Sequence, residues 1–93
     1  FGTITVVSSA GTAVGDTAIT VSGYTKPADE IYKYKVGDTV VTVKYGQKLT
    51  TGWTIWNGTS DITAATGKKI TIASVDTSNR AQAAGNATVT AKT

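Results

Sequence analysis

Side chains along much of the chain alternate between apolar and polar with a period of two, which is the spacing of an extended strand. The pattern is clear in TITVVS (residues 3–8) and in TAITVS (residues 17–22), which the turn-forming segment AGTAVGD separates. We expect these two segments to be strands joined as a hairpin, with Ile4 and Ile19 on the buried face. No stretch sustains the 3.6-residue period of an amphipathic helix.

A second alternating pair follows the single proline of the chain. IYKYKV at residues 31–36 carries its tyrosines on one face and its two lysines on the other, so we expect the tyrosines inside and the lysines in solvent. The turn-forming pair Gly37-Asp38 leads into TVVTVKY at residues 39–45, which alternates again. This arrangement predicts a second hairpin, with Val41 on its buried face.

The C-terminal half contains further short strands and two irregularities. The expected strands are WTIW (53–56), a brief one within SDITAATG (61–64), KKITIASV (68–75) and ATVTAK (87–92). The alternation slips near Val75, as at a β-bulge or strand end. RAQAA (80–84) allows one helical turn, capped by Gly85. About seven short strands with frequent turn signals predict an all-β fold, a small antiparallel β-sandwich of Ig-like type. A small β-barrel is the alternative.

Two of the expected strands share a starting sequence. VGDTAITV occupies residues 14–21, VGDTVVTV occupies residues 36–43, and GNATVTAK near the C-terminus is a looser copy. Glycine accepts a tight-turn backbone, the following Asp or Asn can bond to nearby amides, and the β-branched residues then extend. We therefore interpret the repeat as a strand start at Gly15, Gly37 and Gly85.

The competing interpretation of the repeat is that its acidic residues, Asp16 and Asp38, are cation ligands. Calcium takes about six to eight oxygen ligands, and neither side chain has a carboxylate close by in sequence. His and Cys are absent, which removes the commonest general base, the thiolate nucleophile and nearly all zinc chemistry. Asp29 and Glu30 point in opposite directions if extended. We expect no enzyme, no cofactor and no metal.

Length and charge narrow the class of protein further. The 93 residues fit a single β-domain, residues 1–93, and the missing initiator Met makes an excised or processed part of a longer chain a second reading. The net charge is +3, but the nine basic residues are scattered, so we expect no specific nucleic-acid partner. No apolar run approaches the roughly 18 residues that span a bilayer, so we expect no membrane partner.

Aromatic residues offer the best candidates for a binding surface, because their rings stack on sugars and bases. We expect Trp53 and the tyrosines of residues 31–36 to fill the core. Trp56 lies on the opposite face of its strand from Trp53 and beside the turn that Asn57 begins. The candidate binding surface therefore consists of Trp56, Tyr24 and Asn57.

The segment from residue 53 to residue 93 carries a resemblance to a known class. Its order is WTIWNG, then ITAATGKKI, then VD, then AAGNATVTA. These runs resemble Ala-, Thr- and Val-rich segments of virion proteins from tailed bacteriophages of Gram-positive bacteria. The resemblance implies a β-domain of capsid, head-fibre or decoration type on the virion capsid surface. It implies contacts with a capsid or other virion protein, and no catalytic residues.

Two functions therefore remain open from the sequence. The first is a non-enzymatic structural module on a phage particle, acting by protein–protein contacts. The alternative is a carbohydrate- or cell-wall-binding adhesive β-domain, extracellular or on a cell surface, with a host-surface glycan bound near Trp56 and Tyr24. Exposed edge strands also make a homo-oligomer an option.

Overall fold

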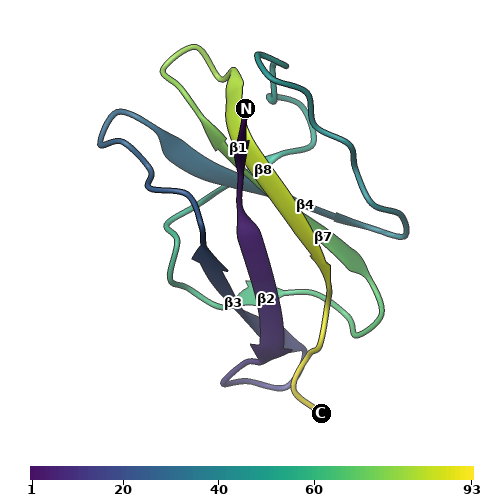
Figure 1. The fold of residues 1–93 in the computed structure, drawn as a ribbon. Helices are drawn as coiled ribbons and strands as arrows, with labels where there is room; N and C mark the ends of the chain where they lie inside the picture. The colour runs from purple at the N-terminus through teal and green to yellow at the C-terminus, as the bar shows by residue number, and fades with distance from the viewer.

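The computed structural model describes residues 1–93 and shows two β-sheets packed face to face (Figure 1). The five-stranded sheet has the order β1 (Gly2–Thr3), β8 (Ala81–Thr88), β7 (Lys69–Val75), β4 (Ile31–Gly37) and β5 (Thr54–Trp56). The three-stranded sheet has the order β2 (Thr5–Ala10), β3 (Asp16–Ser22) and β6 (Ile62–Thr63). The predicted all-β sandwich is confirmed, and the sheets do not close into a barrel. The chain contains no helix, so no helical segment in it can cross a membrane.

The inner core lies between the two sheets. Ile19 and Ile62 of the three-stranded sheet face Ile70 and Ile72 of the five-stranded sheet, and all four side chains are buried. Their positions follow the period-two pattern, because alternate residues of a strand point to the same face. The hairpin expected from residues 3–8 and 17–22 is confirmed as the antiparallel pair β2–β3.

The N-terminal strand passes from one sheet to the other. β1 pairs in parallel with β8, which makes the larger sheet mixed, and β2 then joins β3 in the smaller sheet. At the crossing, the Ile4 amide donates to the Ala84 carbonyl over 2.9 Å. A Cβ on Gly85 would clash with the Ile4 carbonyl oxygen, so only glycine allows the two backbones to approach this closely. The expected helical turn capped by Gly85 is therefore wrong, because residues 80–84 lead into and form β8.

The outer face of the five-stranded sheet is covered by residues 38–53, an irregular segment that we call the outer cover. Val43 and Leu49 of this segment pack on Ala73 and Val75 of β7. The strand expected at residues 39–45, and with it the second hairpin, is wrong. Backbone hydrogen bonds join the cover to residues 79–81 instead: Gly46 donates to Ala81, Ala81 donates to Gln47, and Leu49 donates to Asn79.

The outer cover also changes the environment of the lysine side of β4. The sequence pattern predicts that Lys33 lies in solvent, but Lys33 is only 6% exposed. Its ammonium group donates to the Leu49 carbonyl over 2.9 Å. The alternation of β4 is as predicted, with Tyr32 and Tyr34 half-buried against the inner core. The prediction of solvent beyond Lys33 is wrong because a segment distant in sequence folds over it.

The repeated strand start has three different outcomes. Gly15 has a φ of 88°, and β3 begins directly after it at Asp16, so the interpretation is confirmed there. Gly37 instead ends β4, and Gly85 lies inside β8. The slip predicted near Val75 is confirmed as a register irregularity between β7 and β8 at Ser74/Val75.

Candidate interaction surfaces

Trp56, the first of the predicted binding residues, lies in the inner core. It is 5% exposed, and its ring centroid is 5.7 Å from that of Tyr32. The indole N–H donates to the Ser60 carbonyl over 2.8 Å. The expectation of an exposed Trp56 is wrong, because β5 has the opposite phase: its neighbour Ile55 is the side chain in solvent, 68% exposed. Two tryptophans in WTIW left the phase of this strand undetermined.

Asn57 is exposed, and its side chain holds the turn that follows β5. Its Oδ1 accepts from the backbone amides of Thr59 and Ser60 at 2.9 and 2.8 Å, and its Nδ2 donates to the Ser60 hydroxyl. Gly58 completes the turn with a φ of 89°. Asn57 therefore has a structural role that accounts for most of its hydrogen-bonding capacity.

Tyr24 is half-buried, and its phenol is part of a hydrogen-bonded group. The hydroxyl donates to Glu30 Oε1 over 2.7 Å, and the buried Ser74 hydroxyl donates to the same oxygen over 2.8 Å. Burial, followed by the hydrogen bond to the Glu30 carboxylate, raises the pKa of Tyr24 to about 12. The ring also packs against Gly2, where a Cβ would approach it to 2.6 Å.

Tyr32, on β4, is half-buried between Trp56 and Lys26. Its ring packs on Trp56, and the Lys26 ammonium lies 5.6 Å from its centroid. Burial, with a smaller contribution from Glu30, raises the pKa of Tyr32. We use the name aromatic rim for Tyr24, Tyr32 and Trp56 together with the two charged residues beside them, Lys26 and Glu30. Of the predicted binding residues, Trp56 is therefore buried and Tyr24 half-buried, and only Asn57 is exposed, so no open stacking face results.

Exposed apolar side chains occur at several other places. They are Phe1, Val7, Val14, Ile31, Val40, Tyr45 and Ile55. Phe1 and Tyr45 form an edge-to-face pair with centroids 6.2 Å apart. Ile31 and Ile55 lie on the same face of the neighbouring strands β4 and β5, diagonal to each other in the register. The sequence analysis missed Ile55, and only the phase of β5 would have revealed it.

Open strand edges are a second surface feature. β2 has six residues and pairs with another strand on one side only, through β3, and Val7 on it is 54% exposed. β5 forms the corresponding edge of the larger sheet. Open edges present backbone donors and acceptors to other chains.

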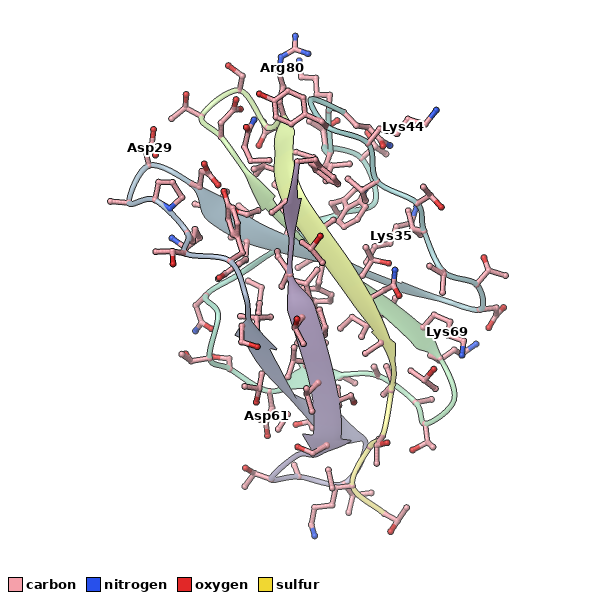
Figure 2. All side chains as sticks on the ribbon, in the orientation of Figure 1. Asp29, Lys35, Lys44, Asp61, Lys69 and Arg80 are labelled. Atoms are coloured by element: carbon pink, nitrogen blue, oxygen red, sulfur yellow. The ribbon has the colours of Figure 1, made fainter.

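Some charged side chains lie on opposite flanks of the molecule, although Lys26 bonds beside Asp29, to the Glu30 carbonyl, and Asp38 pairs with Lys68. Figure 2 shows Lys35, Lys44 and Lys69 on one flank and Asp29 and Asp61 on the opposite one. These five labelled residues therefore give the two flanks a partial difference in charge.

Asp16 and Asp38, the candidate cation ligands, lie apart and have other partners. Asp16 accepts from the Thr63 hydroxyl over 3.0 Å, and Asp38 forms a salt bridge with Lys68. The hydrogen bond from Lys68 lowers the pKa of Asp38. No group of three potential metal ligands and no surface pocket is present.

The surface of the sandwich thus offers open strand edges and isolated apolar side chains but no pocket. The family model described as "S-layer protein SbsC C-terminal domain" matches residues 9–92, and the chain belongs to this family. No curated protein and no solved structure matches the chain.

The family membership corrects the expected phage assignment. The chain is not identified as a capsid, head-fibre or decoration domain, and neither a capsid partner nor a virion location is supported. The runs of residues 53–93 misled because β-strands of unrelated proteins favour the same β-branched residues, Thr, Val and Ile. A cell-surface location, the alternative reading, agrees better with the family.

Proposed function

We propose that this domain is a non-enzymatic structural module of a bacterial S-layer, located on the cell surface. The observation that carries the proposal is the family match over residues 9–92. The absence of His and Cys supports a role without catalysis. In this role the domain contacts other S-layer subunits or the cell wall, as one β-domain of a longer surface protein.

Contacts between subunits are favoured by the partial difference in charge between the two flanks. Lys35 and Lys69 on one side and Asp29 and Asp61 on the other are complementary when copies lie side by side (Figure 2). Complementary charges guide association and fix its orientation more than they add affinity. The open β2 edge offers a backbone surface that a neighbouring subunit can extend.

Immunogold electron microscopy on intact cells of the source organism tests the location. Antibodies raised against the folded domain should label the outer surface densely, and extraction with guanidinium chloride should remove the label together with the lattice. Cells stripped before labelling provide the control. Label restricted to the cytoplasm, or retained unchanged after the lattice is removed, would contradict the proposal.

A cell-wall glycan is the second candidate partner, favoured by the aromatic rim and by the exposed Asn57 beside it. Co-sedimentation with purified cell-wall sacculi tests this partner. Asn57→Asp keeps the Oδ1 that holds the turn but removes the Nδ2 donor, so it should reduce sedimentation if the rim binds glycan. Asn86→Asp, also at an exposed asparagine, is the matched control. Equal sedimentation of both variants and the unmodified domain would exclude the rim as the glycan site.

A further inference from the structure

We propose that the contacts of the N-terminal strand with the C-terminal strand and tail form a mechanical clamp that resists tension applied along the long axis of the domain. The clamp is a property of the fold itself and does not rest on the S-layer location. It assigns a load-bearing function to β1, β2, β8 and the segment that follows β8.

The first observation is the direction of the strands relative to the two ends. Phe1 and Thr93 lie at opposite ends of the molecule, whose longest dimension is 37 Å (Figure 1). β1, β2 and β8 run along this direction, and β1 is parallel to β8. When the two ends are pulled apart, β1 and β8 therefore slide along each other rather than separate sideways.

The second observation is the set of bonds that such sliding would break. Gly2 pairs with Ala83, Thr3 pairs with Ala84, and the Ile4 amide donates to the Ala84 carbonyl. Strand hydrogen bonds lie across the strands, so a load along the strands is shared by all of them at once. A load across the strands would break them one after another.

Packing at the crossing adds a steric obstacle to sliding. The Ile4 carbonyl lies directly over Gly85, and the Val6 side chain reaches to 3.1 Å from where a Gly85 Cβ would be. Ile4 is 3% exposed, and its side chain is fixed in the inner core. Moving the N-terminal strand along β8 therefore requires Ile4 to leave its buried position.

A second load path runs through the C-terminal tail. The Lys92 amide donates to the Asp16 carbonyl, and the Gly15 amide donates to the Lys92 carbonyl, both over 2.9 Å. The Thr90 amide donates to the Ser8 hydroxyl over 2.8 Å. These bonds tie the tail to the β2–β3 hairpin, whereas β1 is tied to β8. Both paths must fail before the two ends separate.

Single-molecule pulling in two directions tests the clamp. The chain has no native cysteine, so introduced thiols are unique attachment points. The axial pair Phe1→Cys and Thr93→Cys loads the strands lengthwise. The transverse pair Phe1→Cys and Ser78→Cys pulls β1 and the β7–β8 turn from the same end, which peels β1 away. Ser78 is exposed, as is Phe1.

We expect the axial unfolding force to be about twice the transverse force or more, because forced unfolding follows the barrier along the direction of pulling. Axial rupture should release the chain between Ile4 and Ala84 in one step of about 270 Å, at the extended length per residue. Denaturant midpoints of the two cysteine pairs should agree, which separates mechanical from thermodynamic effects. Equal forces in the two directions, or a lower axial force, would overturn the proposal.

A matched glycine pair locates the resistance within the fold. Gly85→Ala should lower the axial force, whereas Gly37→Ala should leave it unchanged, since a Cβ at Gly37 meets nothing within 4 Å. If Gly85→Ala does not fold, Thr90→Pro replaces it. This change removes the amide that bonds to Ser8, and Thr90→Ala, which keeps that amide, is its control. An unchanged axial force in the folded variant would place the resistance outside the clamp.

Discussion

The two faces of the five-stranded sheet are both covered, but by different kinds of structure. The inner face packs on a second sheet, with isoleucines such as Ile72 and Ile19 meeting between regular strands. The outer face packs on the outer cover, residues 38–53, whose main anchors are Val43 and Leu49. Regular strands fix many side chains through one repeating geometry, whereas the cover depends on a few individual contacts.

Buried polar groups on the outer face have fewer hydrogen-bond partners than they could use. Lys33 is buried there with a single hydrogen-bond partner, the Leu49 carbonyl. Thr71 on the same face is 1% exposed, and its hydroxyl has no partner. Unsatisfied buried polar groups reduce stability, so the outer cover should open before the sandwich does.

The largest expected effect is at the centre of the inner face. Ile72→Ala removes a fully buried side chain and should cost about 2–5 kcal/mol. A domain of this length is stable by about 5–14 kcal/mol, so the loss should appear clearly in urea denaturation. Ile55→Ala, at an exposed isoleucine, should stay within about 0.5 kcal/mol. Similar losses at both positions would contradict the assigned phase of β5.

A smaller and more local effect is expected at the anchor of the outer cover. Leu49→Ala should cost about 2 kcal/mol, at the low end for such a change, because an irregular segment can partly close the space. Hydrogen exchange should accelerate at the amides of Leu49 and Gly46, while the amides of β7 paired with β4 stay protected. Loss of protection throughout the sheet would show that cover and sandwich unfold together.

A third comparison tests what the buried lysine contributes. Lys33→Met keeps most of the aliphatic stem and removes the ammonium, so relief from burying a charge should offset the lost bond to Leu49 to within about 1 kcal/mol. Lys33→Ala also removes the stem and should cost about 2 kcal/mol through lost packing. Both stabilities come from urea denaturation at neutral pH. A large loss with Lys33→Met would mean that the ammonium itself holds the cover in place.

The smallest expected effect on stability concerns Tyr24 of the aromatic rim. Its folded pKa of about 12 lies above the usual tyrosine value of 10.0, so the neutral phenol is favoured by folding. The contribution is fully present below pH 10 and is lost as the pH rises towards 12. Denaturation midpoints should fall across this range, and Tyr24→Phe should reduce the fall. The pKa of Tyr32 is also raised, so Tyr32 accounts for the part of the fall that remains in Tyr24→Phe. An unchanged fall in Tyr24→Phe would contradict the role of this phenol.

The alternation of apolar and polar residues predicted those strands that pair with other alternating strands. β3, β4 and β7 lie within one or two residues of their expected positions, because their inward residues, such as Ile70 between Lys69 and Thr71, recur with a period of two. Val41, expected on a buried face, is half-buried against the outer core cluster, whereas Tyr45, four residues on, is 67% exposed. Alternation reports which side chains are covered, however, and not whether the backbone pairs, so the outer cover was mistaken for a strand.

The errors share a non-local origin. Residues 80–84, RAQAA, suggest a helix from their composition, yet Ala81 and Ala83 are small because other segments press on β8 from both faces. Gly85 likewise reads as a cap until Ile4 is known to cross it. Trp56 could be placed only once the phase of β5 was fixed by its pairing with Tyr32.

The pairing of β1 with β8 has a consequence for biosynthesis. Gly2 leaves the ribosome early, but its partner Ala83 is made only about 80 residues later, which takes roughly 4–16 s at ordinary translation rates. Until then the first strand has no place in its sheet, and contacts this distant in sequence also form slowly. The nascent domain must therefore be kept from aggregating until its last strand has emerged.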